Sequence, residues 1–226
     1  MKRLIGINFH GIGTPRRPLE PGEAPYWLSR ERFEHVLDQI AAAPDPSAFA
    51  ITFDDGNLSD LDIGLPALAA RGLRARFFVL TGRLGGAGSL DGPDVKALME
   101  AGMTIGSHGI DHTVWPTLDN AALDRELRDS RARLEDLCGC AVREAGIPFG
   151  RYDARVLRSL RAAGYTAAWS SDGGTLRQGA FLRARTSLRA DMPDEKITSI
   201  LAGRIPPLRQ LRRAVGMARR RWTVTG

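Results

Sequence analysis

Two short stretches of the chain carry the side chains that can do chemistry. In the first, residues 52–56 (Thr-Phe-Asp-Asp-Gly), the adjacent carboxylates Asp54 and Asp55 end an apolar run that begins at residue 48. Neighbouring side chains on a strand point to opposite faces, so both carboxylates reach one cavity only if the strand turns there, and Gly56 supplies the backbone freedom. Such a pair can act as a general base of raised pKa, or as a metal ligand beside a free base. A solvated turn between a strand and a helix is the alternative.

The second stretch is residues 106–112 (Gly-Ser-His-Gly-Ile-Asp-His), which follows another short apolar run at 103–105. The chain has four histidines, and two of them, His108 and His112, lie four residues apart here. Two imidazoles and one carboxylate make a three-ligand zinc site that leaves a position open for water. A pair of surface histidines is the alternative, but the aspartate pair elsewhere in the chain favours a metal site.

Strand and helix patterns alternate along the chain and indicate how these side chains are positioned. Strands are expected at residues 4–9, 48–53, 73–80, 103–105, 142–147, 165–170 and 181–188. Helices are expected at 29–43, 58–71, 91–101, 119–137, 153–164 and 193–201. This alternation is typical of an α/β protein with a parallel sheet or barrel.

All the candidate site residues follow predicted strands, at the carboxyl end where (β/α) barrels build their active sites. The candidates are His10, Asp54, Asp55, His108, His112, residues 148–150 and Asp172.

The motifs resemble those of the polysaccharide deacetylases with a NodB-like domain, carbohydrate esterase family four. Residues 52–56 are similar to the first motif of that family, residues 107–112 to the second, and residues 146–150 (Gly-Ile-Pro-Phe-Gly) to the third. The resemblance covers roughly residues 4–188. It implies a distorted (β/α) barrel with about seven parallel strands.

The resemblance also implies roles for the residues that match. Asp55, His108 and His112 would hold a divalent metal, zinc by ligand type, and Asp54 would be the catalytic base. A bound metal polarises an acetyl carbonyl and lowers the pKa of water, and the base takes the proton of that water.

Two positions depart from the family pattern. Gly146 stands where the third motif usually has the arginine that orients the base, although Arg143 and Arg151 are close enough in sequence to compensate. No histidine follows His112, so the final Leu-x-His motif, which supplies the general acid, is missing. His10 is the one histidine placed to line the site, as acid or as substrate contact; a structural histidine capping a turn is the alternative.

Several further residues are candidates for substrate binding. Pro148, Phe149 and Gly150 belong to the third motif, and Asp172 resembles the fourth motif loosely, with a turn aspartate as the alternative. Trp115, and Tyr26 with Trp27, are expected either to form a wall on which sugars stack or to anchor loops.

Charge and length suggest a catalytic domain with a basic end. The chain has 226 residues and a net charge of +6, and its last segment, 204–226, holds seven arginines and no acidic residue. Residues 1–203, the expected catalytic domain, are therefore nearly neutral, which argues against a nucleic-acid partner. The segment 204–226 is expected to be an amphipathic helix that covers the barrel or lies on an anionic membrane.

The start of the chain does not resemble a secretory signal, so the cytoplasm, or the inner face of its membrane, is the expected location. Together these features predict a metal-dependent hydrolase of linear amides. Its substrate would be a polysaccharide or lipid-linked glycan precursor of exopolysaccharide or cell-envelope metabolism, which would lose N-acetyl or O-acetyl groups. The alternative is a catalytically impaired sugar-binding or scaffold protein with the same fold.

Overall fold

The sheet closes almost completely into a barrel. The computed structural model describes residues 3–204 and 207–224, so residues 1–2, 205–206 and 225–226 lie outside the description, as do the side chains of residues 205–209. Within the described residues, the strands form one sheet in the order β7-β1-β2-β3-β4-β5-β6-β8, and β9 also pairs with β1. The strands are β1 (Arg3–Phe9), β2 (Phe49–Phe53), β3 (Ala75–Val79), β4 (Thr104–Ser107), β5 (Glu144–Gly146), β6 (Ala167–Ser170), β7 (Thr175–Arg177), β8 (Leu182–Ala184) and β9 (Thr186–Ser187).

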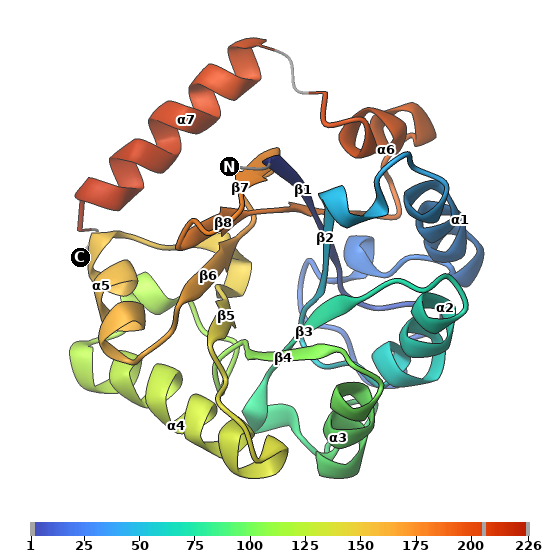
Figure 1. Cartoon of the computed structure of the whole chain (residues 1–226). Helices are drawn as coiled ribbons and strands as arrows, with labels where there is room; N and C mark the ends of the chain where they lie inside the picture. Colours follow the sequence, from blue (N-terminus) through green and yellow to red (C-terminus); the bar gives the residue numbers. More distant parts are fainter. Residues whose placement is uncertain (1–2, 205–206, 225–226) are drawn as a thin grey trace.

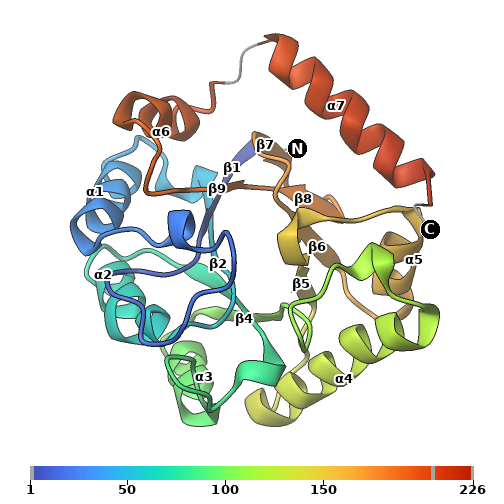
Figure 2. The ribbon, with the colours of Figure 1, turned by 180° about the vertical axis from the view of Figure 1, so that it is seen from behind.

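Helices surround this barrel, as Figures 1 and 2 show from opposite sides. They are α1 (Arg30–Ala41), α2 (Leu65–Ala69), α3 (Gly92–Glu100), α4 (Asn120–Cys138), α5 (Ala154–Ala162), α6 (Asp194–Leu201) and α7 (Pro207–Trp222). Side-chain caps set several starting points: Ser29, Asp119 and Asp153 each accept a hydrogen bond from the backbone of the first turn. The expected (β/α) barrel is confirmed, and β1 to β6 pair in parallel with their neighbours along the chain.

The prediction was wrong in detail at the end of the barrel. Residues 181–188 form two short strands, β8 beside β6 and β9 beside β1, with Arg185 between them. The backbone N–H of Arg185 still donates to Ser170 on β6, at 3.0 Å. The barrel therefore closes at Arg185, which we call the seam: the segment before this residue pairs with β6, and the segment after it pairs with β1. The sequence pattern also missed β7, which is only three residues long and runs antiparallel to β1.

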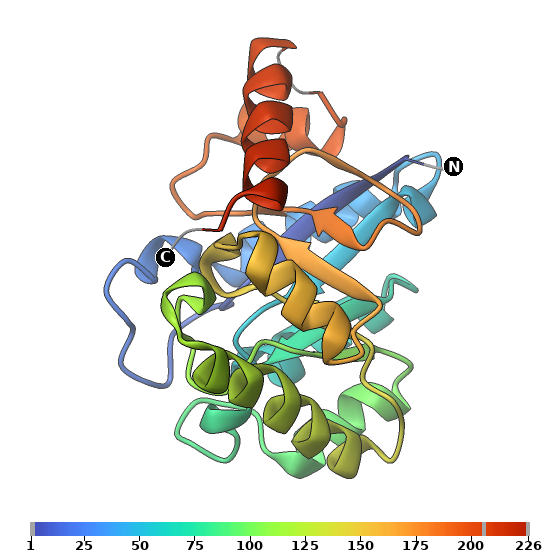
Figure 3. The ribbon, with the colours of Figure 1, turned by 90° about the vertical axis from the view of Figure 1, so that its left-hand side faces the viewer.

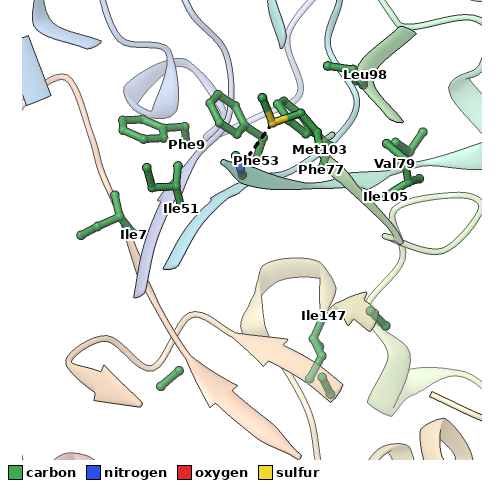
Figure 4. Packing of buried hydrophobic residues seen from close by; sticks show 14 of the residues in the cluster. Ile7, Phe9, Ile51, Phe53, Phe77, Val79, Leu98, Met103, Ile105 and Ile147 are labelled. Carbon is green, nitrogen blue, oxygen red and sulfur yellow. Dashed lines mark hydrogen bonds between the residues drawn. The ribbon is translucent and has the colours of Figure 1, made fainter. Parts of the chain in front are cut away.

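Aromatic packing fixes the strand ends that carry the aspartates. Phe53 stacks on Phe77 with ring centroids 4.6 Å apart, and Phe9 and Phe33 pack around the same cluster. All four rings are fully buried. Figure 4 shows Phe9, Phe53 and Phe77 side by side in this core. Because Phe53 immediately precedes Asp54, this packing fixes where the carboxylates begin.

The arginine-rich helix α7 is docked on the barrel. Its Met217 is buried, and the backbone carbonyl of Thr223 accepts a 2.9 Å hydrogen bond from the N–H of Ala154 at the start of α5. Figure 3 shows the chain leaving the C-terminal end of α7 towards the side of the barrel that carries the loop after β1. Across the described part of the chain, no helix combines the length and apolar character that crossing a membrane requires.

Candidate active site

The two aspartates face one cavity because the chain turns sharply after β2. Asp55 has a φ of +76° and Gly56 a φ of +69°, so two successive residues are left-handed. The sequence pointed to Gly56 alone for this turn. Left-handed backbone is unusual for a residue with a side chain, and here it turns Asp55 towards the cavity that Asp54 also lines. Both residues are almost completely buried, at 3% and 2% exposure.

The structure brings Asp55, His108 and His112 together as a metal site requires. The Nε2 atoms of His108 and His112 lie 3.5 and 3.6 Å from Oδ1 of Asp55. One ligand atom from each residue lies within 4.8 Å of the other two. Oδ1 of Asp55 is buried and has no hydrogen-bond partner among the described residues. An orphaned buried carboxylate oxygen facing two imidazole nitrogens fits a divalent cation.

In both histidines Nε2 faces Asp55, and the other ring nitrogen, Nδ1, is hydrogen-bonded to the protein. Nδ1 of His108 is 2.9 Å from the carbonyl oxygen of Gly146, and Nδ1 of His112 is 2.8 Å from Oε2 of Glu20. When Nδ1–H donates these bonds, Nε2 keeps its lone pair for a metal. Burial lowers the pKa of His108 to about 4, so its ring is neutral at pH 7, the form that coordinates metals.

Asp54 is held by a fully buried arginine. Nη1 and Nη2 of Arg185 each donate a 2.7 Å hydrogen bond to one carboxylate oxygen of Asp54, and Nδ2 of Asn8 donates another at 3.0 Å. Burial alone would raise the pKa of Asp54, but the charge and hydrogen bonds of Arg185 hold it well below its usual range. Asp54 is therefore a fixed, ionised carboxylate directly beside the metal triad.

This arginine comes from a part of the chain that the sequence motifs did not indicate. Arg143 and Arg151, expected to compensate for Gly146, are exposed, and the charge comes from Arg185 at the barrel seam. A Cβ atom on Gly146 would lie 2.8 Å from the ring of Phe78 and 3.0 Å from Nδ1 of His108. The guanidinium of Arg185 itself lies over the Phe78 ring, 5.0 Å from its centroid. The missing arginine of the third motif is thus replaced from the segment after β8, two strands along the sheet from β5.

His10 lies beside the aspartate, as its position after β1 predicts. Its Nε2 is 3.9 Å from Oδ2 of Asp54, and its ring packs on Tyr26 with centroids 4.8 Å apart. Its Nδ1 is buried without a partner among the described residues. The remaining histidine outside the motifs, His35, is exposed on α1 and contacts Gln39.

The comparisons with known proteins agree with this geometry. The sequence model of a family described as polysaccharide deacetylase matches residues 41–168, more than half of the chain. The chain belongs to the polysaccharide deacetylase family.

Among its relatives is a chitin deacetylase of Pestalotiopsis sp, 32% identical over 127 residues, which are 56% of this chain and 42% of that protein. A chitooligosaccharide deacetylase of Rhizobium leguminosarum bv. trifolii is 29% identical over 134 residues, 58% of this chain and 60% of that protein. The matched stretches span about half the length of the curated relatives. The Streptococcus pyogenes deacetylase PplD, solved in complex with acetate, has the same fold: its TM-score is 0.74 at 18% identity, over 88% of this chain and 98% of that one.

The candidate metal triad, Asp55, His108 and His112, lies in a cavity of about 510 Å³. Phe149 lines it beside the triad: its ring is 53% exposed and stacks on His112 with centroids 4.3 Å apart. Tyr26 lines the cavity next to His10, and Asp172 lines it further along. The sequence predicted substrate contacts at these three residues, and all three line the cavity.

Other predicted contacts are absent from the cavity wall. Trp115 is fully buried beneath the loop of Gly109, so the stacking face predicted for it is not available to a sugar. Trp27 is also buried, with its ring packed closely against Gly11. Pro148 is buried and Gly150 is half-buried, and neither lines the cavity, so in this motif Phe149 alone reaches it.

The sequence reasoning missed Arg185 and Glu20. Arg185 stands in a run with Arg183 that reads as ordinary strand, and Glu20 lies in a long loop without periodicity. Glu20 also pairs with Arg83, which fixes the carboxylate that holds His112. The one signal for Arg185 was indirect, because the loss of the arginine at Gly146 implied that another cation must neutralise the base.

Proposed function

We propose that this protein is a metal-dependent hydrolase that removes acetyl groups, N-acetyl in particular, from a glycan of exopolysaccharide or cell-envelope metabolism. The observation that carries the proposal is a fixed, ionised carboxylate, Asp54, beside a three-residue site whose Asp55 Oδ1 is buried without a partner among the described residues. A sugar-binding scaffold would gain little from a base held by a buried bidentate arginine, because burying such a pair is costly.

Asp55, His108 and His112 would hold the metal, and zinc fits their ligand types. When bound, the ion would polarise the acetyl carbonyl and lower the pKa of the attacking water. Asp54 accepts a proton from that water as the hydroxyl adds to the acetyl carbon. Arg185 and Asn8 are positioning residues, because they aim the carboxylate of Asp54 without reaching the cavity themselves.

The carbon–nitrogen bond then breaks, and the departing amine must receive a proton because an unprotonated amine leaves poorly. His10 is the group proposed for this step, since it lines the cavity within 4 Å of Asp54. The products are acetate and a sugar with a free amine. Solvent then takes the proton from Asp54 and returns one to His10.

The test is acetate release from a panel of acetylated glycans and an aryl acetate. Zinc-loaded protein, chelated protein and the Asp54→Asn variant are compared side by side. Activity that requires both the metal and Asp54 would support the proposal. Tight binding of one zinc with no acetate from any substrate would favour the scaffold alternative instead.

We also propose that the protein works at the inner face of the cytoplasmic membrane. The outer face of α7 supports this, because Leu211, Val215 and Trp222 are 63%, 62% and 86% exposed and lie among arginines. Apolar and basic side chains on one helix face suit an anionic lipid surface. Sedimentation with phosphatidylglycerol vesicles should fall when Trp222 and Leu211 become serine, and equal sedimentation of variant and parent would contradict the membrane contact.

A further inference from the structure

The cavity continues away from the metal triad towards a wall of basic side chains. Beyond Thr186 and Ser187 of β9 it is bounded by α6, by the turn after it and by α7. Three cations line this part of the cavity: Lys196 on α6, Arg204 after it and Arg213 on α7. Arg189, before α6, lies over the ring of Tyr26, which packs on His10.

Most of this positive charge is not neutralised by the protein. Arg189 pairs with Asp191, but no carboxylate in the described part of the chain lies within ion-pair distance of Lys196, Arg204 or Arg213. Arg213 is half-buried and donates one 3.0 Å hydrogen bond to the carbonyl oxygen of Thr175. Its Nε is buried and has no partner among the described residues. A buried donor without an acceptor is costly, and an incoming oxyanion would offset that cost.

Apart from Asp55, the acidic side chains that line the same cavity are already engaged. Glu20 contacts Arg83 and His112, Glu23 contacts Arg17, and Asp54 is held by Arg185. Asp172, the cavity-lining acid that follows β6, contacts Tyr152, Ser170 and Arg220. The net field at the far end of the cavity is therefore positive, which attracts an anion.

We infer that this wall is a subsite for an oxyanion carried by the glycan, either a sugar phosphate or a uronic acid carboxylate. The inference rests on the proposed function, since it names the class of glycan presented to the metal triad. The acetyl group would lie at the Asp54 end, and the anionic group of the same molecule would lie between α6 and α7. Arg213 would contribute its free Nε–H, and Lys196 and Arg204 would contribute charge.

The direct test measures binding, so that it does not depend on turnover. Three matched N-acetylated oligosaccharides are titrated into chelated wild-type protein by calorimetry: one neutral, one with a terminal phosphate and one with a terminal uronic acid. One charge-assisted contact strengthens binding by about tenfold or more, so we expect at least one anionic oligosaccharide to bind about tenfold more tightly than the neutral one. The phosphate and uronate arms identify which source of the oxyanion the site prefers.

Variants then locate the effect. Arg213→Gln and Lys196→Gln should each reduce the preference for the anionic oligosaccharide several-fold and leave the affinity for the neutral one unchanged. Arg212→Gln is the matched control, because this exposed arginine immediately precedes Arg213 on α7 and does not line the cavity. Equal affinities of the three oligosaccharides, undetectable binding of all three at millimolar concentration, or an equal loss in Arg212→Gln would each overturn the inference. An anionic preference in a protein that releases no acetate would leave the subsite standing and contradict the proposed hydrolase alone.

Discussion

The two halves of the active site are assembled in different ways. The metal half is the candidate metal site: Asp55, His108 and His112 come from two short segments that follow β2 and β4, and each stands in a recognisable motif. The base half joins Asp54 to Arg185 and Asn8, which are 131 and 46 residues away in the chain. Asn8 reaches Asp54 because β1 and β2 are paired neighbours, whereas Arg185 reaches it only through closure of the barrel between β8 and β1. The two halves differ in what they require of the sequence. The metal half needs particular residues in a short motif, whereas the cation beside Asp54 can come from any strand whose side chains reach that position.

The largest expected effect tests whether the two halves are separate. Asp55→Asn should abolish tight zinc binding and lower acetate release by about a thousandfold or more, because it removes the one anionic ligand. Asp54→Asn should lower activity by about a hundredfold or more while zinc affinity, measured by chelator competition, stays within a fewfold of the parent. Loss of zinc in both variants would show that the halves form one unit.

Arg185 gives the next largest effect. Arg185→Met leaves Asp54 buried without its partner, so we expect the free energy of unfolding to fall by about 3–5 kcal/mol and kcat by about a hundredfold. The Michaelis constant and zinc affinity should change little, since Arg185 does not reach the cavity. Arg185→Lys keeps the charge and should recover part of both losses. If kcat were unchanged while stability fell, Arg185 would serve the barrel and not the base.

His10 tests which residue acts as the general acid, since we propose it for this role in place of the histidine of the missing Leu-x-His motif. His10→Gln should lower hydrolysis of an N-acetyl glycan by about a hundredfold, because the amine needs a proton to leave. Hydrolysis of an aryl acetate should fall much less, because a phenolate leaves without help. An equal drop for both substrates would assign His10 to binding or orientation.

The smallest expected effect concerns the loop after β1. This loop carries His10, which lies beside Asp54, and Glu20, which holds His112. Glu23 is buried there and receives hydrogen bonds from Arg17, Trp27 and the backbone of Glu20. Burial raises the pKa of Glu23, but Arg17 and the other donors outweigh it, so the pKa is lower in the folded state. Its stabilisation is therefore complete above the ordinary pKa of glutamate and is lost as the pH falls through the folded value.

Glu23→Gln should accordingly lower the free energy of unfolding by about 2 kcal/mol at pH 7, with the difference shrinking below about pH 4. Thermal unfolding of variant and parent across this pH range measures it. A difference that stayed constant or grew towards low pH would contradict the assigned ion pair.

The sequence predicted the metal half and most of the barrel because both depend on local patterns. Apolar runs marked the strands, capping residues marked the helix starts, and the His108–His112 spacing marked the ligands. Long-range contacts left no such pattern. Nothing near Arg185 indicates that its side chain reaches past β1 to Asp54, and nothing near Trp115 indicates that it is buried. The split of residues 181–188 into β8 and β9 likewise depends on which neighbours each half pairs with.

The place of Arg185 at the seam links activity to local opening of the fold. The short strands β8 and β9 each pair with a neighbour over only two or three residues, so few backbone hydrogen bonds hold this region beside the buried contacts of Arg185 itself. Such an opening would withdraw the cation from Asp54 while β2 and β4 stayed folded. On warming, acetate release is then expected to fail before the bulk of the helices melts, and amide exchange near residues 182–188 should report the same transition.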